Sequence, residues 1–191
     1  FNNCANSTHL NPVKRVLRYL KGTRDFKLVY LWGQPLALSG YTDASFGNCL
    51  DTRRSYSGFI FQLGSSTISW KCRKQKSVAT STTEAEYMAL CMAVKHHIWL
   101  NYLLLELLKT SIPAAVFSDN MSAIDIAHNQ KVNDRSKHID VQYHFSREKI
   151  LEGKLTLLHV PSADNIADIC TKGLTRPIHE HLSGLLIRGP T

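Results

Sequence analysis

The chain has 191 residues and a mass of 21.6 kDa, and its composition of 43% hydrophobic and 20% charged residues excludes global disorder. The densest apolar stretch, residues 98–108, is interrupted by Asn101 and Glu106, and a membrane span needs about 17 to 25 apolar residues, so we expect no membrane partner. Net charge is +8, and residues 1–80 hold 12 Lys and Arg against 3 Asp and Glu. This surplus indicates a polyanion such as nucleic acid, with a merely basic surface as the alternative.

Residues 1–25 predict a basic amphipathic helix outside the main domain. Asn11 can cap a helix that begins at Pro12, and Gly22 can end it. Its apolar and basic residues alternate at helical spacing: Val13, Val16, Leu17 and Leu20 against Lys14, Arg15, Arg18 and Lys21. Such a helix can dock on a domain beyond this chain or contact nucleic acid, and the pattern does not choose. Phe1 indicates a piece of a longer protein, and the five dispersed cysteines indicate free thiols.

The main domain is predicted over residues 26–175. Three short strands are expected at 36–43, 58–63 and 67–72, and Gly64-Ser65-Ser66 between the last two is typical of a hairpin. A long helix is expected over 83–109 because small and apolar residues recur at helical spacing. Its second half, 96–108, is apolar nearly all round, so we expect it to be largely buried.

After Pro113 the elements alternate between strand and helix. We expect a strand at 114–118, helices at 121–128 and 137–152, a strand at 155–160, a short helix at 164–171 and a C-terminal tail over 176–191. Three antiparallel strands followed by crossover strands predict an α/β fold. Its five-stranded mixed sheet should carry helices on both faces.

Four acidic residues stand among apolar or small neighbours: Asp43, Glu86, Asp119 and Asp168. Asp43 and Asp119 follow strands, and they can face one crevice if those strands are neighbours; each can equally be a turn former or a helix cap. Four gathered carboxylates need cations, and oxygen ligands favour Mg²⁺ or Mn²⁺. With a basic chain, the pattern indicates metal-assisted phosphodiester chemistry with two ions.

Several motifs carry a resemblance to a known family. They are Tyr41-Thr42-Asp43-Ala44-Ser45, Ile68-Ser69-Trp70-Lys71, Thr83-Glu84-Ala85-Glu86-Tyr87-Met88-Ala89, Ser118-Asp119-Asn120, Ser136-Lys137-His138-Ile139-Asp140 and Ala167-Asp168-Ile169-Cys170-Thr171-Lys172. In this order they resemble the ribonuclease H domain of copia-type LTR retrotransposon Pol polyproteins. Residues 9–23 also resemble the segment that connects this domain to the reverse transcriptase.

The resemblance implies a ribonuclease H-like fold that cleaves the RNA strand of RNA–DNA hybrids with two Mg²⁺ ions, for which Mn²⁺ can substitute. It assigns Asp43, Glu86, Asp119 and Asp168 as catalytic metal ligands, in preference to Glu84 and Asp164. It also implies the reverse transcriptase polymerase domain as a partner and a cytoplasmic location, in a virus-like particle, or a nuclear one. Oligomeric state has no signal in the sequence. The histidine-bearing loop of many ribonucleases H is missing after His159, which predicts slow turnover or a substitute group.

A nucleic-acid surface is predicted around the basic run 71–76. A solvated sheet edge is the alternative interpretation of the run. The expected contacts to the hybrid backbone are Arg53, Arg54, Trp70, Lys71, Arg73, Lys74, Lys76, Asn120, Lys137 and His138.

Two rival functions remain. A catalytically decayed or connection-like module would keep the fold and bind the hybrid without cutting it. An integrase or transposase would share the fold, but that class places its Glu after the second Asp, whereas here Glu86 precedes Asp119.

Overall fold

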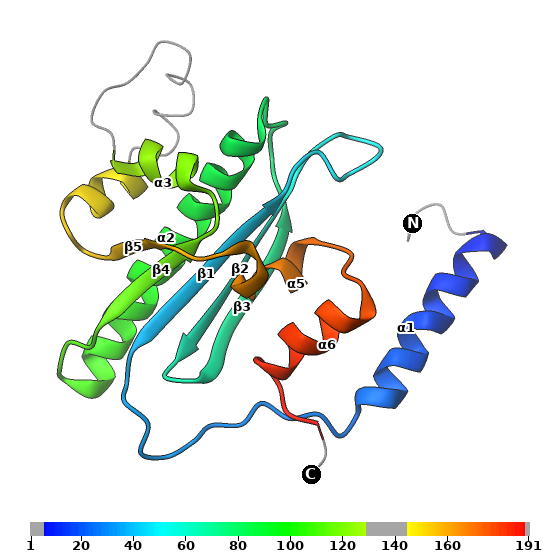
Figure 1. Ribbon diagram of the computed structural model, residues 1–191, viewed down its shortest axis with the longest axis horizontal. Coiled ribbons are helices and arrows are strands. Elements are labelled where there is room, and N and C mark those ends of the chain that lie inside the picture. Colours follow the sequence, from blue (N-terminus) through cyan, green and yellow to red (C-terminus); the bar gives the residue numbers. More distant parts are fainter. Residues whose placement is uncertain (1–5, 129–144, 190–191) are drawn as a thin grey trace.

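The computed structural model describes residues 6–128 and 145–189 and builds them around one five-stranded sheet (Figure 1). The strands are β1 (Leu38–Ser45), β2 (Tyr56–Leu63), β3 (Ser66–Lys74), β4 (Ala114–Ser118) and β5 (Thr156–His159). The helices are α1 (Leu10–Thr23), α2 (Thr82–Leu108), α3 (Met121–His128), α5 (Asp168–Thr171) and α6 (Arg176–Gly184), with 3-10 turns η1 (Ser7–His9) and η3 (Ser162–Asp164). Residues 145–151 are also helical.

The sheet has the order β3-β2-β1-β4-β5. β1, β2 and β3 pair antiparallel, whereas β4 is parallel to β1 and β5 is parallel to β4. The predicted α/β fold with a mixed sheet is therefore confirmed, and the strand and helix bounds differ from the expected ones by a few residues.

Helices cover both faces of the sheet, as predicted. Alternate residues of β2 point to opposite sides: Phe59 and Phe61 join the larger core under α2, whereas Ile60 packs with Ile166 and Leu182 under α5 and α6. In Figure 1, α2 lies behind the sheet and α5 and α6 lie in front of it. The period-2 alternation of a strand thus supplies two separate cores.

The second half of α2 is less buried than expected. Leu100 and Leu104 are buried, but Trp99, Tyr102 and Leu107 are 56%, 64% and 69% exposed. By length and composition α2 would also suit a membrane crossing, although half of its most apolar window is buried inside the fold, as in the core helix of a globular domain. The prediction of a largely buried second half was wrong.

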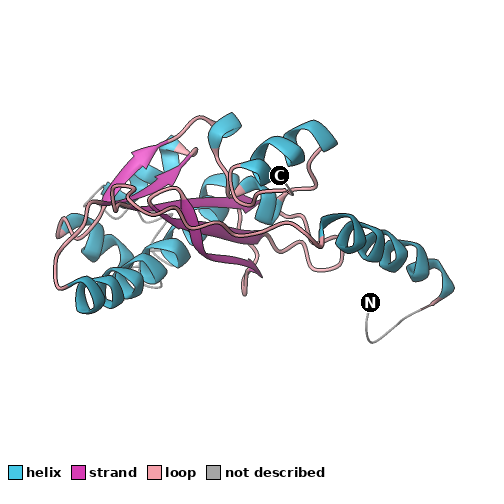
Figure 2. Ribbon diagram, turned by 90° about the horizontal axis from the view of Figure 1, so that it is seen from below, coloured by secondary structure: helices cyan, strands magenta, loops and turns pink. Residues whose placement is uncertain are grey.

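The N-terminal helix lies at one end of the molecule (Figure 2), where the ring of Tyr19 contacts that of His179 in α6 edge-on. None of the residues of α1 is buried. Asn11 lies inside this helix instead of capping it, because η1 precedes α1 and Asn6 caps that turn through its side chain. The predicted cap was therefore wrong by one turn, while the predicted amphipathic helix is present.

The segment expected as a C-terminal tail is structured over most of its length. It forms α6, whose Leu182 is 1% exposed, and Arg188 pairs with Lys27 in an isolated bridge. These residues close the apolar layer on the α5 side. Among the described residues, Cys49, Cys72, Cys91 and Cys170 are free thiols.

Candidate active site

Three aspartates meet where β1 and β4 end. The two strands run parallel with Thr42 opposite Ser118, so Asp43 and Asp119 occupy equivalent places at one edge of the sheet. Asp168, the first residue of α5, comes to the same place. One carboxylate oxygen from each aspartate lies within 4.8 Å of the other two. The two strands are therefore neighbours, which is the condition on which the predicted crevice depended.

A glycine allows α5 to approach the sheet this closely. Gly58 is the β2 partner of Asp43, and a Cβ there would lie 2.6 Å from Thr171 Cγ2 and 2.8 Å from Cys170 Cβ. Asn165, which is fully buried, joins the same segment to β1: its Nδ2 donates to the Thr42 carbonyl at 3.0 Å. Backbone contact and one buried amide therefore place Asp168 beside Asp43.

Asp43 is fully buried and touches two groups from the end of α5. The Thr171 hydroxyl donates a hydrogen bond to Asp43 Oδ2, and Lys172 Nζ lies 3.1 Å from Oδ1. The second contact is an ion pair without hydrogen-bond alignment, since Oδ1 has no hydrogen-bond partner. One carboxylate oxygen is thus fixed by a hydrogen bond, and the other is paired with the ammonium group of Lys172.

Lys172 also binds Asp168, with 2.8 Å between Nζ and Oδ1. Burial raises the pKa of Asp168 to about 6, although the hydrogen bond from Lys172 lowers it. Burial opposes the charge on Lys172 itself, but the hydrogen bond to Asp168 and the charge of Asp43 raise its pKa. The lysine ammonium is therefore stabilised as a cation among carboxylates.

Glu86 projects from the start of α2 toward the same group. Burial, followed by the charges of Asp43 and Asp119, raises its pKa to about 9. Its Oε2 is buried without a hydrogen-bond partner. By contrast, Glu84 closes the beginning of α2, where its Oε2 accepts from the Thr80 backbone N–H at 2.6 Å, as expected of a residue near the helix start.

The donor set fits a divalent cation. Asp43 Oδ1 and Glu86 Oε2 are buried oxygens without hydrogen bonds, and such atoms are costly unless a cation compensates them. Hard carboxylate oxygens are the ligands that Mg²⁺ and Mn²⁺ prefer. The three aspartates can hold a metal, and Glu86 lies close enough for the charges of Asp43 and Asp119 to act on it.

Asp119 is not the cap of α3. Its Oδ2 accepts a hydrogen bond from Ser162 Oγ at 2.7 Å, and Asn120 Oδ1 caps α3 by accepting from the Ala123 N–H at 2.9 Å. The capping interpretation thus applies to Asn120, whose contact with nucleic acid stays a prediction.

The basic residues of the predicted run lie on the α2 side of the sheet, where Lys71 lines a pocket with Phe59 and Lys95. Arg73, Lys74 and Lys76 line a pocket of about 180 Å³ together with Lys95 of α2. Trp70 instead lines an apolar pocket with Ile60 and residues of α5 and α6. Because strand residues alternate in direction, Trp70 faces the opposite side of the sheet from Lys71 and Arg73, and the contact of the basic residues with nucleic acid stays a prediction.

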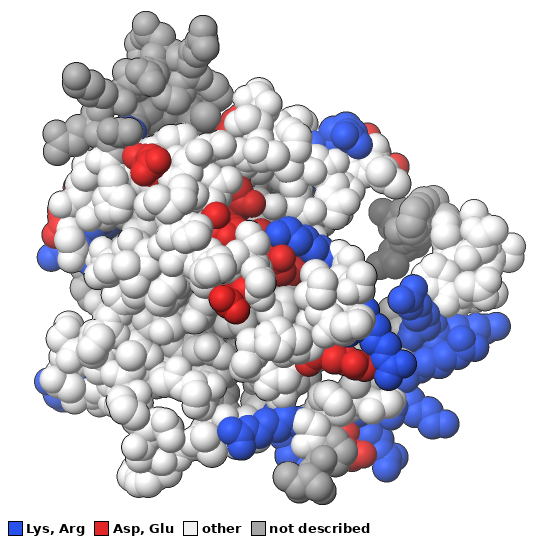
Figure 3. Space-filling model, viewed as in Figure 1, with Lys and Arg blue, Asp and Glu red and all other residues white. Residues whose placement is uncertain are grey.

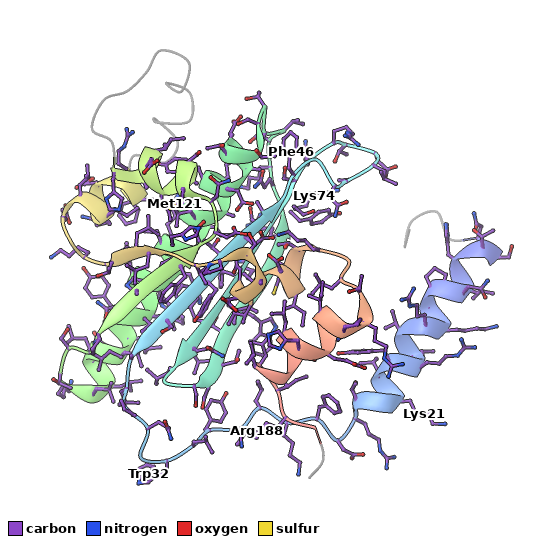
Figure 4. All side chains as sticks on the ribbon, viewed as in Figure 1. Lys21, Trp32, Phe46, Lys74, Met121 and Arg188 are labelled. Carbon is purple, nitrogen blue, oxygen red and sulfur yellow. The ribbon has the colours of Figure 1, made fainter. Side chains whose placement is uncertain are left out.

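The basic pocket lies at the same end of the sheet as the aspartates. Ser45 pairs with Tyr56, which pairs with Lys74, and Figure 4 shows Lys74, Phe46 and Met121 at this end. On the face in Figure 3, acidic side chains gather near the middle with basic groups among them, and further basic side chains gather over α1.

The remaining predicted contacts are less informative. Arg53 and Arg54 lie between β1 and β2, where Arg53 is exposed with a φ of 52°. Lys137 and His138 lie outside the described residues.

Sequence reasoning missed Gly58, Asn165, Thr171, Lys172 and Lys95 as parts of this region. One signal in the sequence could have identified Thr171 and Lys172. They follow Asp168 by three and four residues, so a helix would place them on the same side as Asp168.

Comparison with known proteins identifies relatives of this chain. No family model matches the chain. It is 41% identical over 88% of its length to the retrovirus-related Pol polyprotein from transposon TNT 1-94 of Nicotiana tabacum, and 39% identical over 92% to that from transposon RE2 of Arabidopsis thaliana. The chain spans 13% and 12% of these relatives.

Solved structures share the fold. LC11-RNase H1, isolated from compost by a metagenomic approach, superposes with a TM-score of 0.52 at 17% identity, over 71% of this chain and 92% of that one. The same enzyme in complex with an RNA/DNA hybrid gives a TM-score of 0.51 at 15% identity, over 70% and 93%.

The fold defines the chain as a ribonuclease H-like domain. Its sequence relatives narrow this classification further. The chain belongs to the retrovirus-related Pol polyproteins of transposons and corresponds to a segment of them that has a ribonuclease H-like fold.

Proposed function

We propose that this domain is an endoribonuclease that hydrolyses the RNA strand of RNA–DNA hybrids during reverse transcription of a retrotransposon. The observation that carries the proposal is the convergence of Asp43, Asp119 and Asp168 at one edge of a ribonuclease H-like sheet, with buried Glu86 beside them. These carboxylates repel one another and Lys172 brings a single positive charge among them, so divalent cations would balance the group.

The four carboxylates Asp43, Glu86, Asp119 and Asp168 would hold two Mg²⁺ or Mn²⁺ ions. Bound there, the ions would supply activation of the attacking water and stabilisation of the leaving oxygen. The chain itself fixes the ligands: Thr171 orients Asp43, Ser162 orients Asp119, and Asn165 holds the segment that carries Asp168.

The basic pocket at this end of the sheet would bind the hybrid backbone. Arg73, Lys74, Lys76 and Lys95 line it, and lysine and arginine contacts to phosphates carry no base information. Recognition of an A-form-like hybrid by its shape and 2′-hydroxyl groups accordingly predicts little sequence specificity.

The polymerase part of the same polyprotein is the proposed partner of α1. The apolar residues Val13, Val16 and Leu17 are each more than half exposed on this helix, and the relatives extend far beyond the matched segment. We propose that α1 connects the two parts in the cytoplasm, where a virus-like particle would form.

A non-cleaving module is the second candidate, because the short η3 segment between β5 and α5 carries no histidine. The experiment that separates the candidates uses a labelled RNA–DNA hybrid with Mg²⁺, Mn²⁺ or EDTA. Single-stranded RNA, duplex RNA and duplex DNA are the substrate controls, and Asp119→Asn is the variant.

Metal-dependent cutting of the RNA in the hybrid alone, lost in Asp119→Asn, is the expected result. Hybrid binding without cutting would favour the non-cleaving module. Cutting of duplex DNA would instead favour the integrase or transposase class. A longer chain that includes the preceding polymerase segment tests whether cutting needs that segment.

A further inference from the structure

Lys172 lies among the carboxylates, although the proposed reaction assigns no role to a lysine at this position. Its Nζ lies 3.1 Å from Asp43 Oδ1 and 2.8 Å from Asp168 Oδ1. Both oxygens belong to carboxylates that would ligate the metal, and Asp43 Oδ1 has no hydrogen-bond partner. The ammonium group and a divalent ion therefore compete for the same oxygens.

The neighbouring contacts make this exchange feasible. Thr171 binds the other oxygen of Asp43, so the carboxylate keeps its orientation when Oδ1 changes partner. The Lys172 side chain is 37% exposed, whereas that of Asp43 is fully buried. A flexible four-carbon stem that is partly exposed can turn toward solvent without moving α5.

We propose that Lys172 is a positioning residue that holds the cation place between Asp43 and Asp168 until a divalent ion displaces it, and thereby sets the metal affinity of the site. The inference rests on the proposed function, since it requires these carboxylates to bind metal. It goes beyond it by assigning a role to a basic residue that is itself no metal ligand.

Two consequences distinguish this role from simple packing. Before metal binds, the ammonium offsets the repulsion between the carboxylates, so its loss destabilises the metal-free protein. When metal binds, the ammonium must leave and its charge opposes the ion, so its loss strengthens metal binding. A residue that only maintained the shape of the site would weaken both properties when replaced.

The test uses Mn²⁺ binding by isothermal titration calorimetry and thermal unfolding in EDTA, on the full chain. Lys172→Met and Lys172→Gln both remove the charge, so a failure of one to fold leaves the other. Lys172→Arg restores the charge. Lys149→Met is the matched control, because Lys149 also lies between two carboxylates, those of Glu148 and Glu152, on the separate helix 145–151.

We expect the neutral variants to bind Mn²⁺ about tenfold more tightly, a factor set by one unit charge at close range in a partly solvated site. They should also unfold at a lower temperature in EDTA and gain more thermal stability from Mn²⁺. Lys172→Arg and Lys149→Met should bind Mn²⁺ as the unaltered chain does.

Unchanged or weaker Mn²⁺ binding by both neutral variants would overturn the role of Lys172. The proposed metal site would survive that result if Asp119→Asn still weakened Mn²⁺ binding. No measurable binding to the unaltered chain or to any variant would overturn the metal site, and the role of Lys172 with it.

Discussion

Gly58 shows how one residue controls the position of the site. It faces Asp43 across the β1–β2 pairing, and α5 packs directly over it. Gly58→Ala would push Thr171 and Cys170 away from the sheet, and with them Asp168. Because overpacking a close contact is destabilising, we expect the free energy of unfolding to fall by about 1 to 3 kcal/mol. Hybrid cleavage should fall by more than the fraction of folded protein does.

Gly184→Ala is the control for this change. Gly184 ends α6, and a Cβ there meets nothing within 4 Å, so its replacement should leave cleavage unchanged. A Gly58→Ala protein with full stability and full activity would show that α5 can be displaced without affecting the site.

Glu86→Gln separates folding from catalysis. Burial and the neighbouring aspartates raise the pKa of Glu86 to about 9, so in EDTA near pH 7 the folded chain carries it protonated, and Gln resembles that form. We expect the variant to fold in EDTA with stability equal to or above that of the unaltered chain. Metal-dependent cleavage should disappear, because a neutral amide replaces an anionic ligand.

The same shift predicts a pH dependence. Between about pH 5 and 8, in EDTA, the folded state binds a proton at Glu86 that the unfolded chain releases, so stability falls as pH rises by about 1.4 kcal/mol per pH unit. Denaturant unfolding at several pH values should show this slope reduced in Glu86→Gln. Glu106→Gln, a change of an exposed carboxylate on the same helix, should leave the slope intact; equal slopes in all three proteins would contradict the prediction.

At the scale of elements, α2 explains one error of the sequence-based prediction. Leu100 and Leu104 in its second half still join the core, and Leu108 packs against it. Tyr102 and Leu107 lie at other positions around the helix and are exposed. Hydropathy predicted a helix correctly, but apolar residues all round a helix do not state how many of its sides are covered.

The residues of the site likewise include some that the sequence predicted and some that it did not. The acidic residues stood out against their local sequence, and the mixed sheet followed from the pattern of turns and crossovers. The adjacency of β1 and β4 was only a condition of the predicted crevice, and the structure supplies it. Gly58, Asn165 and Lys172 were not predictable, because their importance depends on the approach of α5 to β2, a contact between distant segments. Strand alternation sends Trp70 and Arg73 to opposite faces, so the tryptophan next to the basic run does not share its surface.

The interior of α2 carries a titratable group whose effect is testable. His97 is fully buried, neither ring nitrogen has a hydrogen-bond partner, and burial lowers its pKa to about 4. The unfolded chain protonates this residue near pH 6.5, so stability falls as pH drops from about 6.5 toward 4 and the effect is complete below the folded pKa.

His97→Leu should remove that dependence. Between pH 7 and pH 5 we expect the unaltered chain to lose about 2 kcal/mol through this residue, and the variant to lose that much less, as measured by denaturant unfolding at each pH. His128→Leu, a change of an exposed residue at the end of α3, is the control. An equal loss in all three proteins would show that His97 is protonated in the folded state without cost.

Across the whole molecule, positive charge occupies two separate regions. One is the pocket of Arg73, Lys74, Lys76 and Lys95 at the carboxylate end of the sheet. The other is α1, which lies at one end of the molecule beside α6, with Lys14, Arg15, Arg18 and Lys21 exposed (Figures 1 and 2). Net charge alone cannot state which region binds a hybrid, whereas the position of the carboxylates favours the pocket.

The salt dependence of hybrid binding decides between the two regions. Each lysine that neutralises a phosphate contributes roughly 0.7 to 0.9 to the slope of log affinity against log salt concentration. In an Asp119→Asn background, which prevents cleavage, Lys74→Ala with Lys76→Ala should weaken binding and reduce the slope by roughly 1.4 to 1.8. The matched pair Lys14→Ala with Arg18→Ala should leave affinity and slope unchanged. A slope reduced only by the α1 substitutions would mean that α1 binds nucleic acid. The exposed apolar side of α1 would then be free for the polymerase at the same time.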